Sequence, residues 1–312
     1  MKNNKFVCIV LIHIFCLIVV VLIAPLFDGL GISMFDYNPL RADNPFIGAA
    51  NYVRLFHDTL FYRALAHTLV FVGVTVTLNI IVTLILAQLI SSLPWNFARG
   101  LFRTVLFLPC VAPMVGTSLV WRNGMFATKN GLVNHLLGYL GIPAINWLGD
   151  ASVVMVAMII FTIWADIGYN TVLFCAGLDG IPKDFSEAAQ IDGAGPVRRF
   201  IYITLPLLGR TFIFVLMMTL ISHFQMFVQF MVLAQRGAPN NAATVLTLLI
   251  YKEGFSNQNM GYASAIAVIL FLVIMVVTVI QRRVNRVAVS YTHLYPSAGK
   301  GVQLHPAPEF PL

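Results

Sequence analysis

The sequence predicts an all-α, polytopic membrane protein with six transmembrane helices, and two observations carry this prediction. Hydrophobic residues make up 59% of the 312 residues and charged residues only 10%, whereas a soluble domain has roughly 25% charged residues. Several apolar runs also reach about 20 residues, the length that a helix needs to cross a bilayer. A mean hydropathy of +0.86 agrees with both, so most side chains are expected to face lipid or the interior of a helical bundle.

The first predicted span covers residues 6–27 and follows Lys2 and Lys5. This run is longer than the roughly 7–15 apolar residues of a cleaved signal peptide, so we interpret it as an uncleaved helix. Further spans are predicted at residues 68–90, 104–121, 151–178, 207–233 and 262–281. Pro109 and Pro113 interrupt the third, which is therefore expected to be a kinked helix packed inside the bundle.

The distribution of lysine and arginine predicts the orientation, because cytoplasmic loops carry more of these residues. With the N-terminus inside, twelve of the 19 fall in cytoplasmic segments and seven in outer segments. Six spans then place both termini in the cytoplasm. The net charge of +7 follows from this bias, and without a long basic cluster it does not indicate nucleic-acid binding.

The connecting segments differ in length and character. The three predicted outer segments, 28–67, 123–150 and 234–261, are long enough to contact a partner outside the membrane. Residues 1–286 form the predicted transmembrane domain. The last segment, 287–312, contains proline and glycine without periodicity, and we interpret it as a disordered or foreign tail.

Motifs of catalysis and nucleotide binding are missing from the sequence. We find no His-Glu-x-x-His, no Gly-x-Ser-x-Gly and no phosphate-binding loop. The four cysteines lie inside apolar runs and are interpreted as small hydrophobic residues. The sequence therefore does not predict an enzyme or a metal site.

The predicted cytoplasmic segment 179–206 is more than a simple connector. Asp184 and Glu187 are spaced like a capping-box pair at the start of a helix. Gly193 is placed to end that helix in a left-handed turn, and Pro196 suits the first position of a second helix. We expect two short helices at an angle on the cytoplasmic face.

The surface of this segment suits insertion into a groove of another protein. Ala188 and Ala189 leave a slim helical surface, and Phe185 provides a large apolar side chain at one end. Pro206 then marks the start of the fifth span.

Seven positions of this segment occur at a familiar spacing, with Asp192 inside the pattern: Glu187, Ala188, Ala189, Gly193, Ile203, Leu205 and Pro206. The pattern resembles the EAA loop of ABC-importer permeases. The resemblance implies that residues 179–206 form the coupling helix that docks on an ATP-binding subunit.

Further residues resemble the maltose-type and glycerol-3-phosphate-type sugar permeases of that family, namely 46–52, 146–148 and 261–265. The resemblance implies a type I permease bundle in the bacterial cytoplasmic membrane. It also implies four kinds of partner: membrane lipid, a second permease subunit in a heterodimer, a cytoplasmic ABC ATPase dimer and an external solute-binding protein. The chain itself would hold no cofactor, since ATP would be bound by the partner subunit.

The solute remains open at this stage. Residues 227–239 lack the Asp and the Gly-Gly-Pro element that such sugar permeases often carry. The sequence therefore allows a sugar, a sugar-like compound or a non-sugar solute.

Polar side chains inside the predicted spans are the candidates for a solute pathway, because a polar group in the membrane is costly unless it faces the bundle or water. Gln225 and Gln229 are four residues apart and are expected to share a helix face with Ser222. Interhelical hydrogen bonding is the alternative role for each. The candidates are Asn79, Gln88, Asp166, Asn170, Ser222, His223, Gln225 and Gln229.

An ion-coupled secondary transporter is the competing class. Such proteins use ionisable residues inside the membrane as relays, and here Asp166, His13 and His223 are the candidates. One carboxylate does not make a relay, so the sequence favours the ATP-driven class.

Overall fold

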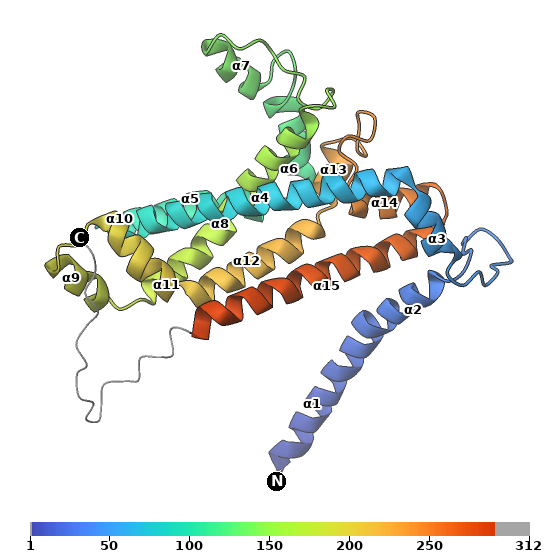
Figure 1. The fold of residues 1–312 in the computed structure, drawn as a ribbon, viewed down its shortest axis with the longest axis horizontal. Coiled ribbons are helices and arrows are strands. Elements are labelled where there is room, and N and C mark those ends of the chain that lie inside the picture. The colour runs from blue at the N-terminus through green and yellow to red at the C-terminus, as the bar shows by residue number, and fades with distance from the viewer. Residues whose placement is uncertain (1, 291–312) are drawn as a thin grey trace.

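The computed structural model describes residues 2–290, with side chains described from 6 to 283. Within that range the protein consists of helices joined by loops (Figure 1), and its only β pairing is an isolated bridge between Phe35 and Phe46. The predicted all-α fold is confirmed for these residues. Five of the described helices are long and apolar enough to cross a membrane, or six if one bent pair counts as a single span.

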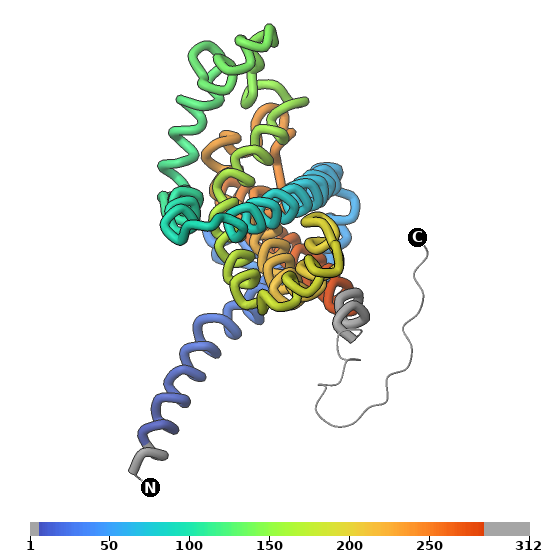
Figure 2. Tube along the Cα trace, turned by 90° about the vertical axis from the view of Figure 1, so that its left-hand side faces the viewer, coloured from blue at the N-terminus to red at the C-terminus, as the bar shows by residue number. Residues whose placement is uncertain are grey.

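The N-terminal helix stands away from the bundle. Helix α1 (Lys2–Ile18) continues through a π-helical turn, η1 (Val19–Ile23), into α2 (Ala24–Ile32). None of its spanning window is buried, and both views show it projecting outward (Figures 1 and 2). His13 is exposed on this helix.

Four long helices form the centre of the bundle: α4 (Thr59–Ser91), α8 (Val154–Asp179), α12 (Gly209–Phe224) and α15 (Met260–Ser290). Helix α4 packs along α8, and α12 packs against the other three. The helices begin and end outside the predicted spans at several points.

Helix α4 starts well before predicted residue 68, because Asp58 caps it. The Asp58 carboxylate accepts a hydrogen bond from the Leu60 N–H at 2.8 Å and another from the Tyr262 hydroxyl at 2.6 Å. At the other end of the chain, α15 continues past residue 286 to Ser290. The rest of the predicted tail, 291–312, lies outside the described residues.

The third span is two helices rather than one kinked helix. Helix α5 (Asn96–Val111) is followed by α6 (Met114–Val120) and η2 (Trp121–Met125), with a 95° bend between them. The prediction of a single helix over 104–121 is wrong, because Pro113 lacks an N–H and the preceding Ala112 is extended, at φ −69° and ψ 139°.

The bent pair nevertheless joins the two ends of the bundle. Near its start, Arg103 Nη2 lies 2.9 Å from Asp179 Oδ2 at the end of α8. At its other end, α6 packs against α13 (Val228–Val232), which follows the far end of α12. We therefore count α5 and α6 as one bent span, which gives six in the described chain.

The fifth span is also broken, after Phe224. The Gln225 N–H donates a hydrogen bond to the Ser222 carbonyl at 3.1 Å, and the Thr247 hydroxyl donates to the Met226 carbonyl at 2.6 Å. The break rotates α13 relative to α12, so the prediction that Ser222, Gln225 and Gln229 share one helix face is wrong.

The end of the bundle opposite residues 179–206 is built from folded segments. They contain α3 (Ala50–His57), α14 (Leu246–Tyr251) and η4 (Lys252–Ser256), while α7 (Leu132–Tyr139) lies in an arm that projects to the side of the bundle (Figure 1). In this arm the buried Asn134 amide donates to the Ile145 carbonyl at 2.8 Å and accepts from Trp147 Nε1 at 2.9 Å. Near η4, burial lowers the pKa of the Lys252 amine, which donates to Asn241 Oδ1 at 2.8 Å.

Candidate coupling loop and transport pathway

Two short helices form residues 184–199, as the sequence predicts. Helix α9 (Asp184–Ile191) and α10 (Pro196–Arg199) lie together at one end of the bundle (Figure 1). Gly193 adopts a φ of +80°. The Ala194 N–H bonds to the Ala189 carbonyl at 2.9 Å, and the Gly193 N–H to the Gln190 carbonyl at 3.1 Å. These two bonds define a Schellman turn, so the predicted left-handed glycine is confirmed.

The predicted cap of α9 is wrong. Lys183 occupies the N-cap position in a helical conformation, at φ −65° and ψ −27°, and no side chain caps the helix. A side-chain cap requires an extended backbone at that position, which Lys183 does not provide. Asp184 and Glu187 instead both lie in the first turn of α9, where the helix dipole favours negative charge.

Arg199 fixes the angle between the two helices. Its Nη1 donates to Gln190 Oε1 at 3.0 Å and to the Ser186 hydroxyl at 3.3 Å. A residue of α10 is thus tied to two residues of α9 across the glycine turn. Local sequence patterns do not show this contact, because the partners are 9 and 13 positions away.

The loop presents an exposed apolar tip. Ile191 is 87% exposed and Phe185 51%, and Glu187, Ala188, Asp192 and Gly193 are also exposed, while Ala189 is half-buried. An apolar tip of this kind suits a groove in another protein.

The last part of the loop joins the bundle. Ile203 and Leu205 are half-buried and lie in η3 (Phe200–Thr204) and α11 (Leu205–Leu207). Pro206 occupies the first turn of α11, directly before α12. Its predicted place at the start of the fifth span is confirmed.

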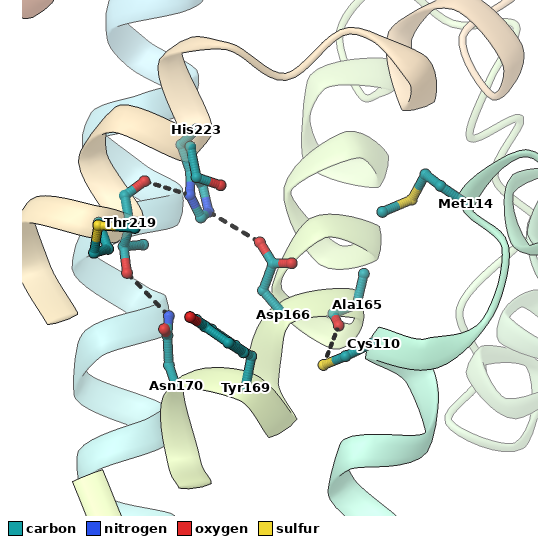
Figure 3. Close-up of a pocket in the computed structure, with 10 residues that line it drawn as sticks. Cys110, Met114, Ala165, Asp166, Tyr169, Asn170, Thr219 and His223 are labelled. Carbon is teal, nitrogen blue, oxygen red and sulfur yellow. Dashed lines mark hydrogen bonds and ion pairs between the residues drawn. The ribbon is translucent and has the colours of Figure 1, made fainter. Parts of the chain in front are cut away.

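A pocket of about 340 Å³ lies within the bundle, between α5, α6, α8 and α12 (Figure 3). Its position follows from the bend at Ala112 and Pro113, which separates α6 from α8. Four of the predicted pathway residues, Asp166, Asn170, Ser222 and His223, line it, together with six that were not predicted for the pathway. The lining is Asp166, Asn170, Ser222, Cys110, Met114, Ala165, Tyr169, Met218, Thr219 and His223.

Asp166 and His223 face each other in this pocket (Figure 3). His223 Nε2 lies 3.7 Å from Asp166 Oδ2, and His223 Nδ1 lies 2.8 Å from the Thr219 carbonyl. The Asp166 side chain is 28% exposed, whereas that of His223 is 1% exposed. The carboxylate therefore reaches the pocket, and the imidazole supports it from behind.

Asn170 connects three helices beside the pocket. Its Nδ2 donates to Asn79 Oδ1 at 2.6 Å and to the Thr219 hydroxyl at 3.0 Å. These bonds join α8 to α4 and α12. Asn79 is buried behind Asn170 and does not line the pocket.

The remaining candidates are scattered. Gln225 is exposed at the end of α12 and Gln229 is buried on α13, and neither lines the pocket. His13 lies on α1, which projects away from the helices α8 and α12 that carry Asp166 and His223 (Figure 1). The three ionisable residues considered for an ion relay thus do not form one connected group in the described structure.

A six-span helical bundle with a polar intramembrane pocket, broken helices and an exposed two-helix loop defines a membrane transport permease. Residues 79–288 match the family described as the binding-protein-dependent transport system inner membrane component. The chain belongs to this family, and the predicted resemblance to ABC-importer permeases is confirmed.

Curated relatives match most of the chain. A probable ABC transporter permease protein of Bacillus subtilis, YurN, is 33% identical over 83% of this chain and 89% of its own length. The arabinooligosaccharides transport system permease protein AraP of Halalkalibacterium halodurans is 34% identical, over 78% and 76%. The sn-glycerol-3-phosphate transport system permease protein UgpA of Yersinia pestis is 35% identical, over 83% and 86%.

Solved structures share the fold. A chain of a bacterial ABC transporter involved in the import of the acidic polysaccharide alginate superposes with a TM-score of 0.78. It is 22% identical, and the match covers 91% of this chain and 96% of that one. A chain of a bacterial alginate ABC transporter in complex with an alginate pentasaccharide-bound periplasmic protein gives a TM-score of 0.79 at 22% identity. The type I permease fold expected from the sequence is therefore confirmed.

Proposed function

We propose that this chain is the permease subunit of an ABC importer that carries a sugar or sugar-like solute across the bacterial cytoplasmic membrane. The two-helix loop with its Schellman turn at Gly193 is the observation that carries the proposal. Sugar-class solutes are favoured because relatives are named for arabinooligosaccharides and glycerol-3-phosphate. A non-sugar solute would leave the permease role intact.

The loop is connected to the pocket on both sides. Helix α8, which precedes the loop, carries Asp166 and Asn170, and α12, which follows it, carries Thr219 and His223. Between α10 and α12 the chain stays helical, and the Thr204 and Leu208 carbonyls accept from Leu208 and Phe212 N–H groups at 2.9 Å. A movement of α9 on a partner would therefore shift two walls of the pocket together.

ATP hydrolysis is assigned to a separate subunit. The sequence contains no phosphate-binding loop, and the exposed tip at Phe185 and Ile191 offers a docking surface for a cytoplasmic ATPase dimer. We infer that this chain is not itself an enzyme and binds no cofactor. Residues 179–206 and both termini would then lie in the cytoplasm.

A second permease subunit is favoured by two apolar surfaces that the bundle leaves uncovered. Helix α1 is unburied along its spanning window. Helix α7 exposes Leu132 and Leu136, and the adjoining Leu140 is also exposed, at the end of the arm that leaves the bundle at the bent span (Figure 2). A heterodimeric partner would cover apolar surface on this scale and complete the wall of the pathway. An external solute-binding protein would dock on the opposite end from α9.

Purification and transport test the proposal. The chain, extracted in mild detergent from its native membrane, should carry with it a second permease and an ATPase. Liposomes that contain the complete assembly should accumulate solute only with ATP.

Glu187→Lys, which reverses a charge on the exposed first turn of α9, should reduce ATPase recovery while leaving the amount of chain in the membrane unchanged. Solute accumulation by the isolated chain without any ATPase would refute the proposal.

A further inference from the structure

Among the residues that the structure describes, the pocket lining includes one carboxylate that reaches the interior and no lysine or arginine. Asp166 is the acidic group among the lining residues and is half-buried, whereas the neighbouring His223 is buried. The arginine closest along α5, Arg103, is engaged by Asp179 at the end of α8. The described lining thus offers no lysine or arginine to neutralise an anionic solute.

The hydrogen bonds of His223 determine what Asp166 presents to a solute. Nδ1 must carry a proton to bond the Thr219 carbonyl at 2.8 Å, which leaves Nε2 facing the Asp166 carboxylate. Nε2 itself has no hydrogen-bond partner in the described structure, because Asp166 Oδ2, at 3.7 Å, is beyond hydrogen-bond distance. The rest of the carboxylate is open to the pocket. An ionised carboxylate accepts hydrogen bonds only, so its partners are hydroxyl and ammonium groups.

We propose that Asp166 is a specificity-determining residue that selects the solute by charge. Neutral, hydroxyl-rich sugars and amino sugars are favoured in this pocket, and phosphorylated or carboxylated sugars are disfavoured. This inference rests on the proposed transport function. It narrows the proposed solutes to compounds that the Asp166 carboxylate can bind. An anionic solute would be repelled by this carboxylate, because like charges repel strongly where water is scarce.

The charge of the pocket can be measured without knowing the solute. Ser222 is exposed and lines the pocket, so Ser222→Cys provides a reporter thiol. The background carries Cys8→Ala, Cys16→Ala and Cys110→Ser, and keeps the buried Cys175. The purified complex is treated with a cationic methanethiosulfonate, the trimethylammonium-ethyl reagent, and with the anionic sulfonatoethyl reagent.

The ratio of the two rates, normalised to a free thiol, should favour the cation by about tenfold, and Asp166→Asn should remove most of that preference. Ser256→Cys, on the exposed surface of η4, is the matched control, and its ratio should not respond to Asp166→Asn. If Asp166→Asn changes the ratio of cationic to anionic reaction rates at Ser222→Cys by less than twofold, the inference is overturned.

Transport separates the inference from the proposed function. Proteoliposomes with the complete importer and its binding protein are supplied with radiolabelled arabinotriose, glucosamine or sn-glycerol 3-phosphate. ATP-driven uptake restricted to the neutral or cationic probes supports the inference. Uptake of sn-glycerol 3-phosphate by the unmodified chain overturns the inference but keeps the permease role. No ATP-driven uptake across a wide panel of sugars would count against the proposed function, and the thiol ratios would still decide the charge of the pocket.

Discussion

Gly193 determines the shape of the coupling loop through its backbone. At φ +80° a side chain would be strained although nothing lies within 4 Å of its position, and such strain costs about 1 kcal/mol. Gly193→Ala should therefore re-aim α9 and reduce recovery of the ATPase by roughly fivefold. Uptake should fall in parallel, while membrane abundance stays unchanged.

Gly195 is a matched control two residues further on. It has a φ of −65° and equally open surroundings, so Gly195→Ala should leave ATPase recovery and uptake near the unmodified level. Equal losses in both variants would show that the loop simply tolerates no added side chain. Unchanged uptake in Gly193→Ala would argue against a coupling role for this turn.

Asn170 is expected to stabilise the bundle. Its bonds to Asn79 and Thr219 join three helices, and interhelical hydrogen bonds in membranes contribute roughly 0.6 to 1.7 kcal/mol each. Asn170→Ala should therefore lower the unfolding temperature of the purified complex by several degrees. Ser222→Ala, in the same pocket but exposed, should not. A loss of uptake in Asn170→Ala without any loss of stability would assign Asn170 to the solute instead.

Local rules predicted the residues whose roles depend on the backbone nearby. Gly193 and Pro196 were found from turn and helix-start preferences, which act over a few residues. The contact between Asp166 and His223 could not be predicted in this way. These two residues are far apart in the sequence and meet only because α8 packs against α12. The sequence did indicate that each was worth attention, since both are ionisable groups inside apolar runs.

At the scale of elements, the angle between α9 and α10 depends on Arg199. Arg199→Met keeps much of the apolar stem and removes the bonds to Gln190 and Ser186, so α9 should become loosely held. We expect ATPase recovery to fall severalfold, with a smaller effect on abundance. Arg198→Met is the matched control, because Arg198 is adjacent and exposed. If both variants behave alike, the positive charge of α10 matters rather than the tie to α9.

The two broken spans show that hydropathy locates a membrane span but does not predict where its helix is interrupted. The break after Val111 was only partly predictable: Pro113 signals a disturbance, but the 95° angle depends on where α6 finds its packing partner, α13. The break after Phe224 has no local signal, because it depends on the Thr247 hydroxyl reaching the Met226 carbonyl. Apolar runs thus located the spans, while tertiary hydrogen bonds and packing determined their ends.

At the scale of the whole molecule, the coupling loop and the pocket are joined through α8, which ends where the loop begins, and α12, which follows the loop. The loop of residues 179–206 is inserted between the two helices that supply most of the pocket, α8 and α12. The close crossing of α5 and α8 completes the frame, since a side-chain carbon at Gly168 would overlap the Leu106 carbonyl. The helices α8 and α12, which flank the coupling loop and line the pocket, can therefore move together.

The number of spans decides on which side of the membrane the loop lies. With the N-terminus in the cytoplasm, counting α5 and α6 as one span places Ser186 inside and Ser256 outside. If the bent pair instead entered and left the membrane on one side, both positions would exchange sides. Arg103 beside Asp179 at one end, and α6 against α13 at the other, argue for the crossing.

Cysteine labelling of intact cells tests this topology. Ser186→Cys and Ser256→Cys are made separately in the background with Cys8→Ala, Cys16→Ala and Cys110→Ser, and a membrane-impermeant maleimide is added before or after permeabilisation. We expect Ser256→Cys to be labelled before permeabilisation, and Ser186→Cys at least tenfold more strongly after it, because a charged reagent cannot cross the hydrocarbon core. The reverse pattern would mean five crossings and an outward-facing loop, which no cytoplasmic ATPase could reach. The permease mechanism proposed for this chain therefore depends on the bend at Pro113 lying within a helix pair that crosses the membrane.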